Sequence, residues 1–298
     1  INIFFIINLI FLLKIFDIFP MVLLFFFPLI FIMILEDLFQ NISIKTRFLF
    51  IIFTTFSLVY FSNSPLEIFG LNTKDQFFSS FILATVLTSI GIIVTCNAWN
   101  FVDGLNGIAS GLGASTLLIF SLLSKEIYID GFREFLIIVA FIFLGFCLLN
   151  LISGKVFLGD TGSCFLGTLI GWSGVLLVNS NSNISPWAIF LIIIYPASDI
   201  TFSVIRRIYY KKSPLKSDKL HLHSLLYLYL TLSLNLKPKT INSISGLSIF
   251  LLGILPGIYC LNINALYPNV FYASIIYFFL YIILYIYLKK MLKLASKI

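Results

Sequence analysis

The chain has 298 residues, of which 60% are hydrophobic and only 10% are charged, and its formal net charge is +7. With a mean hydropathy of +1.09, a chain of this length cannot hide its apolar side chains from water. This excludes a water-soluble globular protein and predicts a polytopic membrane protein. The four cysteines form no C-x-x-C pair, so neither a disulfide framework nor a zinc site is expected.

Apolar runs bounded by charges and by Pro, Gly or Asn clusters predict one all-α membrane domain over residues 1–298, a helical bundle of about ten spans. The first three runs are short for a span of about 20 residues. The expected spans are residues 1–13, 21–35, 47–61, 77–95, 105–124, 134–151, 163–179, 187–205, 243–262 and 268–288.

The basic residues indicate how these spans are oriented. If the loops after even-numbered spans and the C-terminus share one side, that side holds 15 of the 19 Lys and Arg residues. The other side holds only Lys14, Lys74, Lys125 and Arg133. The positive-inside rule then makes the even side cytoplasmic. The net charge is therefore a topology signal, and no nucleic-acid partner is expected.

Four polar stretches on this predicted cytoplasmic side could carry chemistry. The first is Glu36-Asp37, an acidic pair after the second span. Alone it is weak, because acids at a helix end usually only face water. The second is the glycine-rich stretch 97–113, which contains Asn97, Asn100, Asp103 and Asn106. Its Asp-Gly and Asn-Gly pairs favour a tight turn, and Asp103 or Asn106 can cap the following helix. From this stretch alone, a plain interhelical turn is an equally good interpretation.

The third stretch, residues 156–167, repeats this pattern around Asp160, which has a glycine before it and another two residues after it. Glycines let backbone N–H groups approach an anion, and a carboxylate can hold a divalent cation that bridges phosphates. Two such stretches on one predicted face favour a phosphate site over two unrelated helix caps.

The fourth stretch runs from Pro196 and Asp199 through a basic loop to two histidines, and its candidate substrate-binding residues are Arg206, Arg207, His221 and His223. The lysines of this loop fit a topogenic patch facing anionic lipid equally well. The histidines stand at i, i+2, which does not place them on one helix face. Beside cations, they could donate hydrogen bonds to phosphate or sugar oxygens, although a structural His pair stays open.

Together these stretches resemble the polyprenyl-phosphate N-acetylhexosamine-1-phosphate transferases, whose superfamily includes the phospho-N-acetylmuramoyl-pentapeptide transferases. The resemblance rests on four motifs in order across most of the chain. The run Arg-Arg…Ser-Pro…Asp-x-x-His-x-His looks like the N-acetylglucosamine-type branch. The motifs are Glu36-Asp37, Asn97-x-x-Asn100-x-x-Asp103-Gly-Leu-Asn106-Gly, Phe157-Leu-Gly159-Asp160-Thr-Gly-Ser163, and Pro196-x-x-Asp199 through His221-Leu-His223.

The resemblance implies transfer of an N-acetylhexosamine 1-phosphate from a UDP-sugar to undecaprenyl or another polyprenyl phosphate, with release of UMP. This would be a first membrane step of cell-envelope polysaccharide synthesis, such as lipopolysaccharide synthesis, at the cytoplasmic face of a bacterial plasma membrane. A homodimer is left open. Mg²⁺, or Mn²⁺, would be held by Asp160 and Asp103, and Asp37 would orient or deprotonate the acceptor. Arg and His of the fourth stretch would neutralise phosphate charge.

Several positions depart from the family pattern, which often has Asp at positions 36 and 106 and His at position 224. Here these residues are Glu36, Asn106 and Ser224. The family also implies an earlier span and a cytoplasmic loop, so an N-terminal piece is expected to be missing. Two alternatives stay open: a transporter or channel with acids at a cytoplasmic mouth, and an inactive truncated family member.

Overall fold

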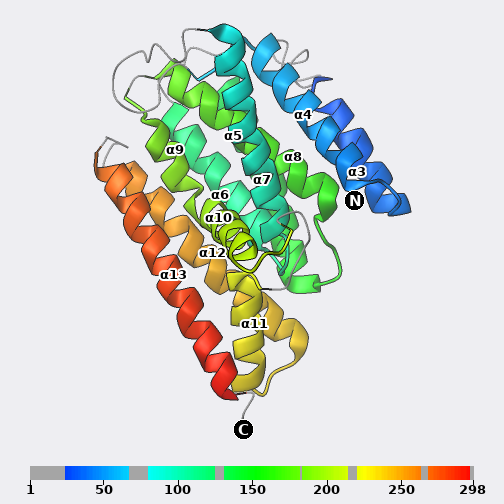
Figure 1. The fold of residues 1–298 in the computed structure, drawn as a ribbon, viewed down its shortest axis with the longest axis vertical. Helices are drawn as coiled ribbons and strands as arrows, with labels where there is room; N and C mark the ends of the chain where they lie inside the picture. Colours follow the sequence, from blue (N-terminus) through cyan, green and yellow to red (C-terminus); the bar gives the residue numbers. More distant parts are fainter. Residues whose placement is uncertain are drawn as a thin grey trace.

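The computed structural model describes residues 24–66, 80–124, 131–181, 183–213, 220–262 and 268–295. In these ranges the chain folds into helices alone, which confirms an all-α polytopic membrane protein (Figure 1). The helices are α3 (Phe27–Phe39), α4 (Ile44–Phe61), α5 (Phe81–Val102), α6 (Ile108–Leu123), α7 (Phe132–Ser153), α8 (Gly159–Ser180), α9 (Pro186–Ile192), α10 (Ile194–Tyr209), α11 (Leu222–Ser233), α12 (Pro238–Asn262) and α13 (Asn269–Ala295).

The expected number of ten spans is wrong. Among the described residues, six helices are long and apolar enough to cross a membrane, or up to seven if the bent pair α9 and α10 is one span. Helices α3 and α6 have only 13 and 16 residues. At about 1.5 Å per residue, both are shorter than the ~30 Å hydrocarbon core of a bilayer. The first expected span, residues 1–13, lies outside the described ranges.

Helix α8 is the central helix of the bundle, and 89% of its apolar window is buried. It packs against α5, α3 and α6. A Cβ atom at Gly167 would lie 2.8 Å from backbone atoms of Thr95 and Cys96 in α5. Only glycine allows such a close approach of two membrane helices. This contact fixes the C-terminal end of α5 against the N-terminal end of α8, where the polar motifs lie.

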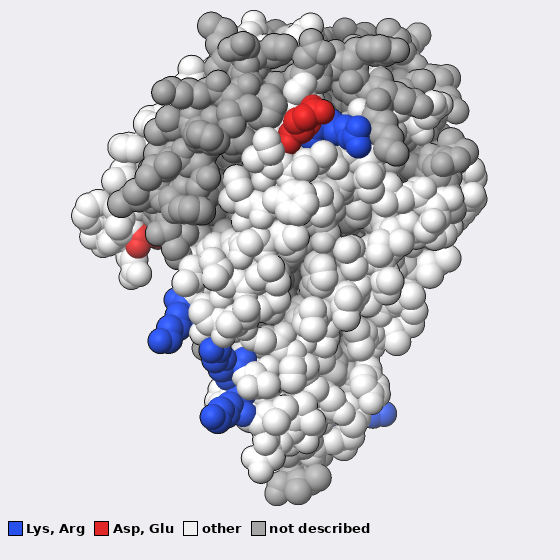
Figure 2. Space-filling view, turned by 180° about the vertical axis from the view of Figure 1, so that it is seen from behind, with Lys and Arg blue, Asp and Glu red and all other residues white. Residues whose placement is uncertain are grey.

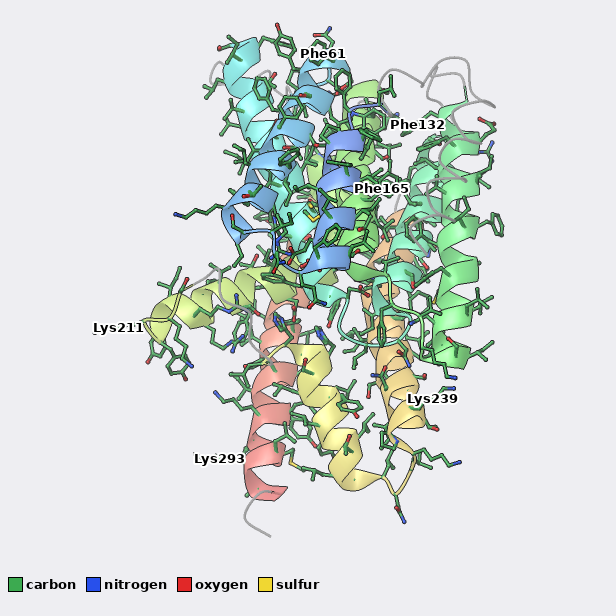
Figure 3. All side chains as sticks on the ribbon, turned by 90° about the vertical axis from the view of Figure 1, so that its right-hand side faces the viewer. Phe61, Phe132, Phe165, Lys211, Lys239 and Lys293 are labelled. Atoms are coloured by element: carbon green, nitrogen blue, oxygen red, sulfur yellow. The ribbon has the colours of Figure 1, made fainter. Side chains whose placement is uncertain are left out.

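Helices α9 and α10 meet at a bend of 82°. Beyond the bend, α10 runs sideways beneath the upper helices (Figure 3). Its polar residues Asp199, Arg206 and Arg207 are buried, whereas Ile205 and Ile208 are exposed. The apolar face of α10 therefore suits contact with lipid, and its polar face points into the protein.

On the face in Figure 2, basic groups lie in the lower part, an acidic group lies at the left edge at about half height, and a small charged group lies near the top. The broad surface between these groups carries no charged side chains. Lys211, Lys239 and Lys293 lie in the lower half, and Phe61 lies at the upper end (Figure 3). The structure thus keeps on one side three lysines that the charge pattern assigns to the cytoplasm.

Labelling of single cysteines tests this orientation. Glu134, in the first turn of α7, and Ser213, just beyond α10, are both exposed and lie on opposite predicted sides. In a variant without the four native cysteines, Glu134→Cys should react with a membrane-impermeant thiol reagent in intact cells. Ser213→Cys should react only after lysis. The opposite pattern would contradict the cytoplasmic placement of the basic loops.

Candidate active site

The candidate active site lies where the end of α5 meets the start of α8. Asp160 is in the first turn of α8, where the helix dipole favours a negative charge. Its Oδ1 accepts a hydrogen bond from Nδ2 of Asn100 at 2.9 Å, and the same nitrogen donates to Oγ of Ser163 at 3.1 Å. The Asp160 side chain is still 34% exposed, so a ligand can reach it.

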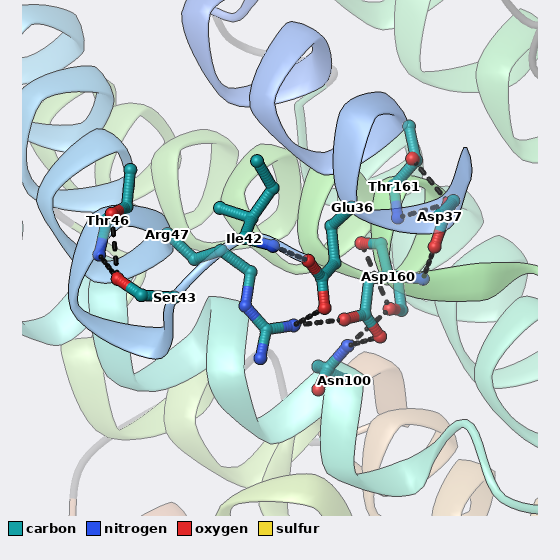
Figure 4. A network of polar contacts seen from close by, with 10 residues as sticks. Glu36, Asp37, Ile42, Ser43, Thr46, Arg47, Asn100, Asp160 and Thr161 are labelled. Atoms are coloured by element: carbon teal, nitrogen blue, oxygen red, sulfur yellow. Dashed lines mark hydrogen bonds and ion pairs between the residues drawn. The ribbon is translucent and has the colours of Figure 1, made fainter. Parts of the chain in front are cut away.

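Arg47 also contacts Asp160, and sequence reasoning had counted it only as a topology signal. From the first turn of α4, its Nη1 lies 2.5 Å from Oδ2 of Asp160 and 3.7 Å from Oε1 of Glu36 (Figure 4). Arg47 and Asp160 are 113 residues apart, so no local spacing could reveal the pair. The only sequence signal was that Arg47 closes the polar stretch that begins with Glu36-Asp37.

Asp37, near the end of α3, holds the start of α8. Its carboxylate accepts hydrogen bonds from the backbone N–H groups of Asp160 and Thr161, both at 3.2 Å, and from Oγ1 of Thr161 at 2.6 Å (Figure 4). A carboxylate from another helix thus caps α8. Gly159 makes this approach possible, because its φ is +71° and a Cβ there would lie 3.0 Å from the Asp37 carboxylate.

Asp103 directly follows α5 and completes the acidic group. Burial raises the pKa of its carboxyl from 3.8 to about 7, and the negative charges of Asp160 and Asp37 add to this shift. A hydrogen bond from the backbone of Gly159 opposes it. Three carboxylates therefore converge on the first turn of α8. Such crowding is unfavourable unless a proton or a cation compensates the charge.

The carboxylates of Asp103 and Asp160 are groups that would fit a Mg²⁺ site completed by phosphate oxygens. Mg²⁺ prefers oxygen ligands and is commonly bound through one or two carboxylates plus phosphates. Their mutual repulsion is what a cation would relieve. In the part of the chain that the structure describes, no group of three or more His, Cys, Asp or Glu side chains could hold a metal ion. These residues alone therefore offer no complete coordination shell.

Asn97 is not brought to the acidic group in the same way as Asn100. Its Nδ2 donates a hydrogen bond to the carbonyl oxygen of Ile93 in its own helix, at 2.7 Å. Asn97 lies about one helical turn before Asn100 on α5. The two asparagines are therefore neighbours with different partners, since Asn100 bonds Asp160 and Asn97 bonds its own helix.

A second polar cluster forms around Asp199, which is fully buried in α10. Its Oδ2 lies 2.6 Å from Nδ1 of His221, and its Oδ1 accepts a hydrogen bond from the Tyr281 hydroxyl at 2.7 Å. The backbone N–H of Leu222 also donates to Oδ1, at 3.3 Å. The carboxylate therefore orients the His221 ring and joins the start of α11 and the middle of α13 to α10.

His223 lies beside the turn that carries Asp103. Its ring stacks on His221 with centroids 5.3 Å apart, and a Cβ at Gly104 would lie 2.5 Å from its Nε2. Burial lowers the pKa of His223 to about 4; the charge of Asp199 opposes this shift, and His221 adds to it. At pH 7 the ring is therefore neutral. It can form hydrogen bonds to a ligand, and the expectation that it neutralises phosphate charge remains a prediction.

The two arginines of the fourth stretch are buried beneath this cluster. The Arg206 guanidinium lies 5.9 Å from the Tyr285 ring centroid, and that of Arg207 lies 5.5 Å from the Phe101 centroid. Phe101 also meets His221 edge to face, at 5.7 Å. Phe101 therefore links the fourth stretch to the end of α5. Residues 214–219 of this loop lie outside the described ranges.

An apolar crevice of about 220 Å³ opens between α5, α8 and α9, further along the helices that carry the acidic group. Along α5, Asp103 is eight residues beyond the nearest lining residue, Thr95, or about 12 Å at 1.5 Å per residue. The crevice thus begins within about two helical turns of the carboxylates. Its lining includes Gly91, Thr95, Gly171, Val175, Ile189 and Phe190.

The sequence matches known proteins over the same region. The model of the family described as "Glycosyl transferase family 4" matches residues 19–178. A "Probable undecaprenyl-phosphate N-acetylglucosaminyl 1-phosphate transferase" of Bacillus subtilis is 33% identical over 194 residues, which cover 64% of this chain and 53% of the relative. A "Decaprenyl-phosphate N-acetylglucosaminephosphotransferase" of Mycolicibacterium smegmatis is 32% identical over 179 residues, 53% of this chain and 43% of the relative.

The similarity extends to the second branch of the superfamily. A "Phospho-N-acetylmuramoyl-pentapeptide-transferase" of Staphylococcus haemolyticus is 29% identical over 193 residues, covering 62% of this chain and 58% of the relative. The chain spans about half the length of the curated relatives it matches. Asp37, Asp103 and Asp160 lie within the region that the family model matches, whereas His221 and His223 lie beyond it.

Proposed function

Because the chain belongs to glycosyl transferase family 4, we propose that it transfers an N-acetylhexosamine 1-phosphate from a UDP-sugar to a polyprenyl phosphate and releases UMP. The observation that carries this proposal is the convergence of Asp37, Asp103 and Asp160 on one turn at the end of membrane helices. At such a place a lipid phosphate from the bilayer can meet a nucleotide from the cytoplasm.

The proposed reaction forms one P–O bond and breaks another. An oxygen of the lipid phosphate attacks the phosphorus that carries the sugar, and the bond between this phosphorus and the UMP oxygen breaks. A phosphate monoester has a second pKa of about 6, so the nucleophile is largely ionised at pH 7. It therefore needs little general-base help. Positioning and charge compensation must do most of the catalytic work.

The residues of the acidic group divide these tasks. Asp160 and Asp103 would hold Mg²⁺, or Mn²⁺, which would neutralise charge on the diphosphate and on departing UMP. Arg47 places a positive charge beside Asp160. Asp37 uses its carboxylate to hold the start of α8, which fixes Asp160. Its role in orienting or deprotonating the acceptor remains a prediction.

The second polar cluster is suited to the donor. Asp199 fixes His221, and His221 stacks on the neutral His223 beside the Asp103 turn. A neutral imidazole can donate to a sugar or phosphate oxygen, whereas the guanidinium groups of Arg206 and Arg207 supply positive charge nearby. We assign Asn100 to positioning, since its amide is engaged by Asp160 and Ser163. Asn97 is assigned to substrate binding by the motif alone.

The apolar crevice is suited to the acceptor. A polyprenyl chain needs an apolar surface that continues into the bilayer, and the crevice lies on the same two helices as the carboxylates. Gly91 borders open space, since a Cβ there would meet nothing within 4 Å, whereas Gly171 lets α8 pack closely against Ile92 of α5. In this proposal the lipid chain would lie in the membrane with its phosphate beside the carboxylates, and the site would face the cytoplasm of a bacterial plasma membrane.

A transporter or channel is the competing function, and the placement of acids argues against it. Transport pathways carry ionisable residues near the bilayer midplane. Here Asp37, Asp103 and Asp160 lie at helix ends. Asp199 is deeper, but its carboxylate is engaged by His221 and Tyr281. The acids are therefore arranged around one end of the bundle rather than along a path through it.

A transfer assay separates these functions. Membranes containing the protein should convert UDP-N-acetylglucosamine labelled in the sugar-linked phosphate, plus undecaprenyl phosphate, into an organic-extractable lipid. Label should enter the lipid in equal amount to the UMP released. Addition of excess UMP should move the label from the lipid back to the UDP-sugar. The reaction is reversible because it breaks one diphosphate bond and forms another of similar energy. Absence of labelled lipid in membranes where the protein is folded would contradict the proposed transferase.

A further inference from the structure

The turn that carries Asp103 is held at its far end by two helices. On the α7 side, the backbone N–H of Gly107 donates to Oδ1 of Asn150 at 2.5 Å. The Nδ2 of Asn150 donates in turn to the carbonyl oxygen of Val156, just before α8. One amide side chain therefore joins the Asp103 turn to the segment that leads to Asp160.

On the other side, the turn is bonded to the start of α12. The backbone N–H of Asn106 donates a hydrogen bond to Oδ1 of Asn242 at 2.7 Å. The side-chain Nδ2 of Asn106 donates a second one to Oγ of Ser243 at 3.2 Å. Ser243 donates its own proton to the carbonyl oxygen of Leu151 at 3.0 Å. These bonds connect α12 with both the Asp103 turn and the end of α7.

The proton of Ser243 decides which residue fits at position 106. A hydroxyl has one proton, and here it is engaged by the carbonyl of Leu151. Its oxygen must therefore accept a hydrogen bond from residue 106. The amide of Asn106 can donate this bond, whereas a carboxylate cannot. The asparagine at this position thus matches the serine on α12.

α12 also lies against the turn without any space between them. A Cβ atom at Gly246 would be only 2.1 Å from the carbonyl oxygen of Asn106, so a larger residue there would push the turn and the helix apart. This close contact and the hydrogen bonds that Asn106 donates to Asn242 and Ser243 involve the same residue. Asn106 is therefore located by α12 through both its backbone and its side chain.

We propose that Asn242 and Ser243 are positioning residues, which hold the Asp103 turn at the place where it acts in the reaction. This rests on the transferase function proposed above. Neither residue lies in the region 19–178 that the family model matches. The start of α12 would thus act on catalysis through Asp103, without contacting either substrate.

Substitution of Asn242 tests the proposal. Asn242→Leu keeps the side-chain size but removes the acceptor, and the unpaired N–H should lower kcat per folded enzyme by about 10-fold or more. The KM for the UDP-sugar should change less than about 3-fold, because no substrate contact is lost. Asn242→Asp keeps an oxygen acceptor and should restore kcat to within about 3-fold of the wild type. Asn262→Leu is the matched control, since Asn262, at the other end of α12, donates its side-chain hydrogen bond to Ile258 of its own helix in the described part of the chain.

Hydrogen exchange of the segment 103–107 gives a second readout that does not depend on turnover. Asn242→Leu should speed exchange of the Asn106 amide relative to the wild type, and Asn262→Leu should not. Unchanged exchange and unchanged kcat, or a loss confined to KM, would overturn the positioning role. If the wild type transfers no sugar phosphate, the transferase function fails. Exchange at Asn106 then decides by itself whether α12 holds the turn.

Discussion

Asp160→Asn is expected to lower the rate of sugar-phosphate transfer by at least about 100-fold, since each 1.4 kcal/mol of lost transition-state stabilisation is tenfold in rate. Asn keeps the shape and one oxygen, so the bond from Asn100 can persist. It removes the formal charge that a hard cation needs. It also turns the amide NH₂ group towards Nη1 of Arg47. Two hydrogen-bond donors then face each other in place of the ion pair between Arg47 and Asp160.

This loss should exceed any effect on folding. Removal of the charge from the first turn of α8 costs about 1 kcal/mol of stability or less through the helix dipole, and loss of the partly exposed ion pair with Arg47 adds about 1 kcal/mol or less. Transfer should be measured against Mg²⁺ concentration for the wild type, Asp160→Asn and Glu134→Gln. Glu134 also stands in the first turn of a helix, but it is exposed and belongs to α7. A wild-type rate and Mg²⁺ dependence in well-inserted Asp160→Asn would contradict the metal site.

The placement of the acids at one end of the bundle follows from the sequence. Polar, glycine-flanked stretches are costly in lipid, so they must lie where helices end. Asp103 follows α5, and Asp160 begins α8, on the same predicted side. Asn100 and Asp160, 60 residues apart, could be expected near each other because both motifs border that side.

The sequence could not predict the side-chain contacts that form around the start of α8. Arg47 meets Asp160 because α3 and α4 pack beside α8 and α5, and this packing depends on side chains throughout the bundle. Likewise, the Asp37 carboxylate caps a helix more than 120 residues away in the sequence. Capping patterns read from sequence are local, so they cannot indicate a cap donated from another helix.

Hydropathy also overstated the number of spans for a physical reason. It detects apolar runs, but burial among other helices requires the same composition as contact with lipid. The helices that form within two of these runs, α3 with 13 residues and α6 with 16, are too short to cross a bilayer. The run that became α9 and α10 bends by 82°, and its polar residues turn inward. Arg206 and Arg207 are therefore buried, although their sequence is that of a basic loop.

Asp103→Asn should change activity and stability in opposite directions. As a ligand of the same proposed cation, Asp103 should be needed for transfer, and its loss is expected to cost about 100-fold, or about 2.7 kcal/mol. In the resting protein, however, its charge is unfavourable, because burial and the carboxylates of Asp160 and Asp37 raise its pKa to about 7. Asn removes that charge and keeps a hydrogen-bond acceptor for the backbone of Gly159.

The stability effect should depend on pH with a defined sign. A carboxyl group with a raised pKa binds more protons in the folded state than in the unfolded one between about pH 4 and 7, so the free energy of unfolding falls as pH rises through this range. Full ionisation of a carboxyl whose pKa is raised from 3.8 to about 7 would cost up to about 4 kcal/mol, and solvent screening reduces this to about 1 to 3 kcal/mol.

Asp103→Asn should therefore melt at a higher temperature than the wild type at pH 8 with EDTA, by about 2 °C or more, and the difference should vanish near pH 4. Glu134→Gln is again the control, because the carboxylate of Glu134 is exposed to solvent in the first turn of α7. Equal melting temperatures for Asp103→Asn and wild type at pH 8 would show that the three carboxylates do not repel one another. The reason for a cation at this turn would then be lost, even if transfer were slow.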